Sequence, residues 1–345
     1  MTDLTPKERF IRALECKDVD KVPVCSVTQT GTIELMRLSG ANWPEAHFDA
    51  EKMATLAIAG HELAGLEAVR YPFDGTGMAQ TLGCKIIEGT YDTQPSIVDF
   101  PFKEAEDAEN LTIPENLLEC ERVATLLEAT DFVKDRISED IPVVAGILGP
   151  AGLAMSLIGA RNYLMWFISK PDTIKQLITT CTDICIEYSN ALFDHGADAI
   201  CLPDSEAGPD LIPPEFFEMM ILDEYKRYNQ KVTGKTIAHI CGDASDILEP
   251  LSTSGFDGIS IEEKVDVGYA KSIIGNKVCL IGNISPVHTL LGMPPEKLKE
   301  QAKNCIDDGI DILAPGCGLA PHTSLANLKA FVASRDEYYM EKGEL

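Results

Sequence analysis

The stretch ADAICLPDSEAGPDLIPPEFFEMMILDEYKRYNQKVTGKTIAHIC, residues 197–241, indicates the fold class because it holds a strand, a helix and a second strand in that order. Residues 197–203 and 235–241 are nearly continuous apolar runs. Parallel strands that are covered on both faces have this composition. Between them, residues 213–232 show an amphipathic helical pattern that opens on prolines, as the first turn of a helix can. The stretch therefore predicts one strand-helix-strand unit of a parallel sheet.

The same alternation of apolar strand and helix recurs along the chain, with further helical patterns at residues 49–65 and 171–196. Eight strands that alternate with helices are the count of a (β/α)8 TIM barrel, and we expect residues 1–345 to form a single barrel domain. An open doubly wound sheet is the alternative, but no Gly-rich dinucleotide loop follows the first strand. The predicted strands cover residues 22–27, 66–73, 141–148, 197–203, 235–241, 256–262, 277–283 and 311–316.

Residues 84–116 interrupt this alternation. Residues 84–103 alternate between apolar and polar side chains as a β-hairpin does, and an acidic loop follows them. We expect an insertion between the second and third barrel strands, and not a second domain.

Composition narrows the classes of partner. The chain has 29 lysines and arginines against 55 aspartates and glutamates, so its formal net charge is −26. Such a surface repels phosphate backbones and anionic lipid, which argues against nucleic acid and membrane partners. The number of cysteines, eleven, is odd, and their spacing is not that of a disulfide framework. The N-terminus shows no apolar region of the kind that a signal peptide has. These features predict a cytoplasmic protein.

Reactive side chains stand at two predicted strand ends. His239 and Cys241 are two residues apart and therefore point to the same face of the fifth strand. Cys317 follows the eighth strand, between Gly316 and Gly318, which allow close backbone approach. Because strand ends converge at the mouth of a barrel, these three residues form a candidate catalytic zinc shell with a vacant fourth position. The alternative is that each is an ordinary packed core residue.

Polar residues at other strand ends complete the candidate site. A fourth zinc ligand could come from Glu263, or alternatively from Glu262, after the sixth strand, although rim carboxylates are often only solvated. Candidates for substrate binding, each of which could instead cap a loop, are Gln29, Arg70, Asp74, Asp204 and Asn283.

The ligand set indicates a reaction class. Two thiolates cancel the double charge of zinc, which leaves it a modest Lewis acid and a poor source of hydroxide. Coordination nevertheless deprotonates a thiol, whose pKa of about 8.5 otherwise keeps it mostly protonated at neutral pH. We therefore expect alkylation of a zinc-bound thiolate and not hydrolysis.

The His-x-Cys pair His239 and Cys241, followed some seventy residues later by Cys317, is the specific part of a family resemblance. Supporting stretches are GPAGLAMSLIGARNYL (149–164) and LIGNISPVHTLLGMPPE (280–296). Over essentially its whole length the chain resembles the cobamide:coenzyme M methyltransferases of methanogenic archaea, in the uroporphyrinogen decarboxylase superfamily of (β/α)8 barrels.

The resemblance implies one zinc ion bound by His239, Cys241 and Cys317, with Glu263 filling the vacant position before the thiol arrives. It implies methyl transfer, during methanogenesis from methylated compounds, from a methylated corrinoid protein to the thiol of coenzyme M (2-mercaptoethanesulfonate). The zinc-bound thiolate would attack the methyl carbon in line, with cobalt(I) leaving. Methylcobamide would be a substrate that a transient partner protein carries. The sequence does not separate the methanol pathway from the methylamine pathway.

Two other functions stay open. A uroporphyrinogen decarboxylase-like enzyme, or a corrinoid methyltransferase with another acceptor, would share the fold. The porphyrin enzyme, however, needs no zinc and holds its substrate with arginines after the first strand, where this chain has none before Arg37. A non-catalytic zinc- or corrinoid-binding protein would require a metal whose coordination positions are all filled.

Overall fold

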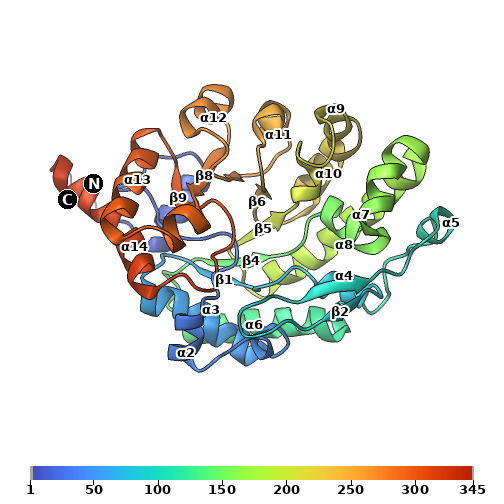
Figure 1. Cartoon of the computed structure of the whole chain (residues 1–345), viewed down its shortest axis with the longest axis horizontal. Coiled ribbons are helices and arrows are strands. Elements are labelled where there is room, and N and C mark those ends of the chain that lie inside the picture. The colour runs from blue at the N-terminus through green and yellow to red at the C-terminus, as the bar shows by residue number, and fades with distance from the viewer. Residues whose placement is uncertain (1–2, 344–345) are drawn as a thin grey trace.

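The computed structural model describes residues 3–343 and is built around a parallel sheet of seven strands in the order β1-β4-β5-β6-β7-β8-β9 (Figure 1). Each neighbouring pair is parallel, and the sheet curls into a half-barrel. Six of these strands lie within predicted ones, and β8 extends one residue beyond its predicted range of 277–283. Their bounds are β1 Val69–Tyr71, β4 Val143–Gly146, β5 Ala199–Pro203, β6 Lys235–Ile240, β7 Gly258–Ile261, β8 Cys279–Ile284 and β9 Ile312–Pro315.

The predicted first strand, residues 22–27, lies between the two edges of this sheet. Val24 forms a single parallel bridge with Leu313 of β9. On the other side, the Val24 carbonyl accepts the N–H of Glu67, 2.9 Å away and just before β1. Pro23 has no N–H to donate, which limits a regular ladder here. The (β/α)8 barrel is confirmed, with seven regular strands and one extended segment, and the open doubly wound sheet is wrong.

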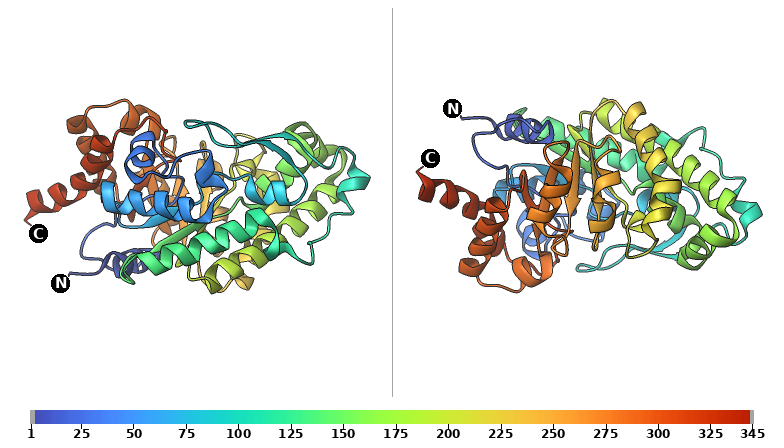
Figure 2. Two further views of the ribbon diagram at one scale, coloured as in Figure 1. Left: turned by 90° about the horizontal axis from the view of Figure 1, so that it is seen from below. Right: turned by 90° about the horizontal axis from the view of Figure 1, so that it is seen from above.

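Helices surround the sheet and one fills its base (Figures 1 and 2). Phe10 and Leu14 of α1 pack in a cluster with inward-facing strand residues such as Ile237 and Ile281. The predicted helix at 213–232 is divided by the π-helical turn η4 (Phe217–Ile221). The helices are α1 Pro6–Leu14, α2 Ile33–Ser39, α3 Ala50–Ala64, α4 Gly77–Thr81, α5 Ala105–Ala108, α6 Glu121–Arg136, α7 Pro150–Ser169, α8 Pro171–Asp194, α9 Pro214–Phe216, α10 Leu222–Lys231, α11 Leu248–Leu251, α12 Val267–Ile274, α13 Pro295–Asp307 and α14 Leu325–Lys342. No helix within residues 3–343 combines the length and apolar character needed to cross a bilayer.

The predicted hairpin insertion is confirmed between β1 and β4. Strands β2 (Lys85–Ile87) and β3 (Ser96–Asp99) pair antiparallel and form a separate two-stranded sheet. Figure 2 shows this hairpin running alongside the barrel. The loop that joins its two strands reaches the candidate site, as described below.

Candidate metal centre

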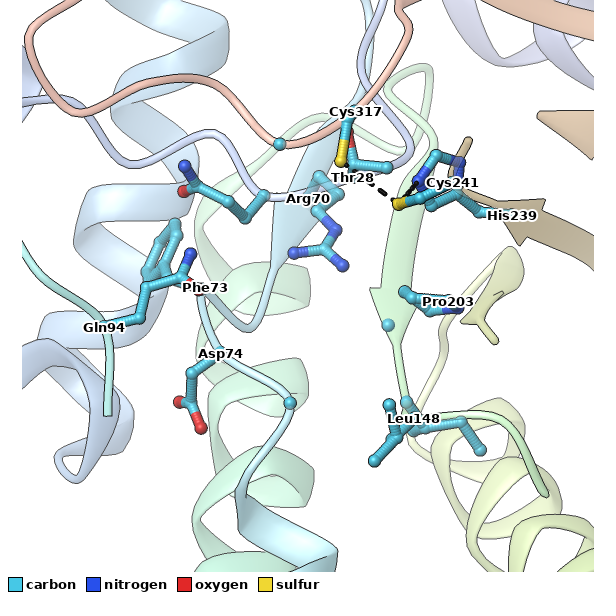
Figure 3. Close-up of a pocket in the computed structure, with 15 residues that line it drawn as sticks. Thr28, Arg70, Phe73, Asp74, Gln94, Leu148, Pro203, His239, Cys241 and Cys317 are labelled. Carbon is cyan, nitrogen blue, oxygen red and sulfur yellow. Dashed lines mark hydrogen bonds between the residues drawn. The ribbon is translucent and has the colours of Figure 1, made fainter. Parts of the chain in front are cut away.

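The structure brings the three predicted metal ligands together at the carboxyl ends of β6 and β9 (Figure 3). The Nε2 atom of His239 lies 3.1 Å from Cys241 Sγ, which lies 3.4 Å from Cys317 Sγ. All three ligand atoms lie within 4.8 Å of one another. His239 is buried, whereas both cysteines are half-buried and can be reached from the mouth of the barrel.

These separations suit a tetrahedral metal. With Zn–S bonds of ~2.3 Å and a Zn–N bond of ~2.0 Å, two sulfurs would lie about 3.8 Å apart and a nitrogen and a sulfur about 3.5 Å apart. The observed separations of 3.4 and 3.1 Å are slightly shorter. Two thiolates and an imidazole are ligands that zinc prefers, and three protein ligands leave one position for a substrate.

Ser260 orients the imidazole of His239. The two residues face each other on β6 and β7, and His239 Nδ1 lies 3.0 Å from Ser260 Oγ. When Nε2 binds a metal, Nδ1 carries the proton and donates it to this oxygen. No sequence pattern singles out Ser260. Its position two residues before Glu262 on a predicted strand is its only signal.

The two thiols form a hydrogen bond with each other, 3.4 Å between the sulfurs. The hydrogen bond between them raises the pKa of Cys241, as does burial, and it lowers the pKa of Cys317 against the opposing effect of burial. A metal cation that binds both sulfurs would displace their protons and convert both groups to thiolates.

The two glutamates lie next to this group without joining it. Glu262 Oε2 accepts the Gly242 N–H at 3.0 Å, and Glu263 Oε1 accepts the Ser285 hydroxyl at 2.6 Å. A Cβ at Gly316 would stand 3.1 Å from Glu262 Cα and 3.2 Å from Glu263 N, so the backbone segments pack closely at this glycine. Neither carboxylate belongs to the ligand cluster found in the described part of the chain, so the fourth ligand stays a prediction.

A cavity of about 260 Å³ opens beside the metal ligands. Its walls include Gln29, Arg70 and Asp74, three of the predicted substrate-binding residues. Gln94, from the loop between β2 and β3, also lines it, and no sequence signal singled this residue out. The lining residues are Thr28, Gln29, Arg70, Phe73, Asp74, Gly75, Gln94, Gly146, Ile147, Leu148, Pro203, His239, Cys241, Cys317 and Gly318.

Two of the polar lining residues already have protein partners. The Asp74 carboxylate accepts hydrogen bonds from Thr76 and pairs with Arg122 at 3.1 Å. Burial alone would raise the pKa of Asp74, but His47 and Arg122 lower it to about 2. Gln29 Oε1 accepts the Gly31 N–H at 2.7 Å, and its amide group donates to the Leu319 carbonyl.

The structure places Asp204 and Asn283 outside this cavity. Asp204 accepts the Gly152 N–H at 2.6 Å, at the start of α7, and the Tyr225 hydroxyl at 2.7 Å. Burial, together with the nearby charge of Glu206, raises the pKa of Asp204 to about 7. Asn283 donates to the Val265 carbonyl at 2.8 Å and lines a separate cavity. Substrate binding by these two residues stays a prediction.

Fold and site together define a TIM-barrel protein with a candidate thiolate metal centre at the mouth of the barrel. Residues 5–338 match the uroporphyrinogen decarboxylase (URO-D) family. The chain is 44% identical over 340 residues to methylcobamide:CoM methyltransferase MtaA of Methanosarcina barkeri, an alignment that covers 98% of this chain and 100% of that protein. It is 38% identical over 344 residues to methylcobamide:CoM methyltransferase MtbA of Methanosarcina acetivorans, with coverages of 98% and 99%.

A solved structure gives the same result. A methyltransferase from Methanosarcina mazei matches with a TM-score of 0.95 and 43% identity, covering 98% of this chain and 100% of that one. The chain therefore belongs to the uroporphyrinogen decarboxylase family and, within it, to the methylcobamide:CoM methyltransferases. It is an enzyme.

Proposed function

We propose that this enzyme transfers a methyl group from a protein-carried corrinoid to the thiol of coenzyme M, and that it does so with one zinc ion held by His239, Cys241 and Cys317. The observation that carries this proposal is the meeting of these three ligand atoms, within 4.8 Å of one another, in the wall of a cavity at the barrel mouth. The names of the full-length relatives support the methyl donor and the acceptor.

Zinc at this centre would supply a thiolate from a bound thiol at neutral pH. The thiol proton leaves to solvent, and the thiolate sulfur attacks the methyl carbon. As the new sulfur–carbon bond forms, the carbon–cobalt bond breaks and its electron pair stays on cobalt. His239, Cys241 and Cys317 would hold the zinc ion, and with it the bound thiol, at the cavity wall. Phe73, Leu148 and Pro203 provide an apolar surface for the carbon chain.

Metal analysis and a methyl-transfer assay test the proposal together. We expect about one zinc per chain, and Cys241→Ala should lose both the zinc and the methylation of coenzyme M by free methylcobalamin. Cys279→Ala is the matched control, because Cys279 is a fully buried cysteine of the barrel interior that takes no part in the centre. Full activity in a metal-free sample would refute the zinc proposal.

The alternatives give different results in related assays. A corrinoid methyltransferase with another acceptor would prefer a different thiol or tetrahydrofolate. A non-catalytic zinc protein would show an X-ray absorption spectrum that does not change when thiol is added. Corrinoid proteins from the methanol and methylamine pathways, offered in turn as methyl donors, would identify the partner.

A further inference from the structure

We propose that Arg70 is the anion-binding group of the cavity and that it restricts the substrate to short thiols with an anionic end. This inference rests on the proposed function, since it concerns the thiol that the metal centre receives. It adds that Arg70 selects this thiol and that the selected property is a negative charge at the end opposite the sulfur.

Arg70 is buried and incompletely paired. Its side chain, on β1, leaves the residue 5% exposed. Its Nε donates to the Val27 carbonyl at 3.2 Å, and its Nη1 donates to the Pro72 carbonyl. A guanidinium has five N–H donors. Within residues 3–343, its Nη2 finds no acceptor, and no carboxylate forms an ion pair with it.

Other arginines with little exposed side chain each form an ion pair with a carboxylate, which Arg70 does not within residues 3–343. Arg9 pairs with Asp20 at 2.7 Å, and Arg335 pairs with Glu67 at 2.9 Å. Arg122, whose side chain is 9% exposed, pairs with Asp74. Burying a charge without a partner is costly, so proteins normally pair it. Arg70 is the exception among these residues, and it is the one that lines the cavity beside His239, Cys241 and Cys317.

The guanidinium of Arg70 points into the cavity (Figure 3). It lies between the sulfur pair of Cys241 and Cys317 and the ring of Phe73. Gly146 of β4 makes room for it, because a Cβ at this position would collide with Arg70 Nη2. Burial lowers the pKa of Arg70 to about 10, which keeps the group charged at neutral pH.

The surroundings favour an anionic ligand. Arg70 is the single lysine or arginine among the described residues that line the cavity. The acidic lining residue, Asp74, is already neutralised by Arg122. Because the chain carries a net charge of −26, an anion is repelled at long range and requires a local cation to bind.

The shape of the guanidinium indicates the ligand class. Its planar fork donates parallel hydrogen bonds to two oxygens of a sulfonate or carboxylate. Coenzyme M carries a sulfonate two carbons from its thiol. Because Arg70 and the two cysteines line one cavity, we place the sulfur of coenzyme M at the metal centre and its sulfonate at Arg70. Uncharged and cationic thiols of the same length lack this second contact.

The first test compares thiols as methyl acceptors, with free methylcobalamin as donor. In the native enzyme, coenzyme M should have a KM on the order of 10- to 100-fold below that of 2-mercaptoethanol, and cysteamine should be the poorest substrate. Arg70→Met should raise the KM for coenzyme M by that factor, keep its zinc, and leave the KM for 2-mercaptoethanol nearly unchanged. Arg37→Met, an exposed residue of α2, is the charge-matched control.

The second test measures the binding of ethanesulfonate, which has no thiol, by calorimetry on metal-free protein. Native protein should bind it and Arg70→Met should not, and this holds even if the zinc proposal fails. If Arg70→Met does not fold, the inference is tested by two measurements on native protein: the KM values of the thiol series and the binding of ethanesulfonate. Equal KM values for coenzyme M and 2-mercaptoethanol, or no ethanesulfonate binding by native protein, would overturn the inference. Loss of zinc from Arg70→Met would also overturn it, because Arg70 would then serve the cysteine thiolates.

Discussion

Replacing Ser260 with alanine should weaken zinc binding without unfolding the barrel. Ser260 is fully buried on β7, and its Oγ lies 3.0 Å from Nδ1 of His239, which is 1% exposed. In the metal-bound state Nε2 faces the metal, so Nδ1 must carry the proton. Alanine would leave this N–H buried without an acceptor.

The size of the effect follows from that lost acceptor. An unsatisfied buried donor costs about 1–3 kcal/mol. Metal-free protein avoids most of this cost, because its proton can move to Nε2, which faces Cys241 Sγ at 3.1 Å. The loss therefore falls on the metal-bound state. We expect zinc affinity to fall about 10- to 100-fold, the range found when such supporting partners of metal ligands are removed.

A competition titration with a chelating dye measures this affinity, and thermal unfolding of the metal-free proteins measures folding. Ser189→Ala is the matched control: Ser189 is fully buried on α8, and its Oγ lies 2.7 Å from Tyr228 Oη, in no contact with the metal ligands. It should lose stability and keep its zinc affinity. If Ser260→Ala binds zinc as tightly as native protein, Ser260 does not orient His239 and the proposed geometry of the centre is wrong.

Three further predictions concern the cavity, the acid limit and the barrel base. Gly146→Ala should displace the Arg70 guanidinium and raise the KM for coenzyme M but not for 2-mercaptoethanol; equal changes for both thiols would contradict this. Burial raises the pKa of Asp20, but Arg9 lowers it from 3.8 to about 2. A depressed pKa stabilises the folded state above the unfolded value, so Asp20→Asn should cost about 2 kcal/mol at pH 7, and urea titrations should show the difference shrinking as the pH falls from about 4 to 2. Phe10→Ala should empty the barrel base and cost about 3–5 kcal/mol in denaturant titrations, with zinc content unchanged.

The strands and the meeting of the three candidate ligands could be predicted from the sequence because both depend on local patterns. Buried parallel strands require nearly continuous apolar runs, and all seven regular strands coincide with predicted ranges, with β8 one residue longer at its end. The two-residue spacing of His239 and Cys241 places them on one face of β6. Barrel closure then brings the end of β9, and with it Cys317, to the same mouth.

The sequence could not show which polar residues at the rim of the barrel face the cavity and which only support the fold. Arg70 and Asp204 both stand at predicted strand ends, yet Asp204 accepts hydrogen bonds from the start of α7 and from Tyr225, whereas the Nη2 of Arg70 finds no acceptor within the described chain. The contacts of a side chain that follows a strand depend on which helix or loop packs beside it. Gln94 shows the same limit, because only the path of the hairpin loop brings it to the cavity.

The sequence by itself determined the barrel, its hairpin insertion and the candidate cluster of His239, Cys241 and Cys317, since periodicity and spacing act along the chain. Only the tertiary structure decided that Ser260 faces His239 across the sheet and that Glu263 is held by Ser285. It also decided that Arg70, which has no ion-pair partner within residues 3–343, lines the same cavity as the two sulfurs. These contacts depend on the register between strands and on the packing of distant segments. Neither the register nor the packing can be deduced from the spacing of residues along the chain.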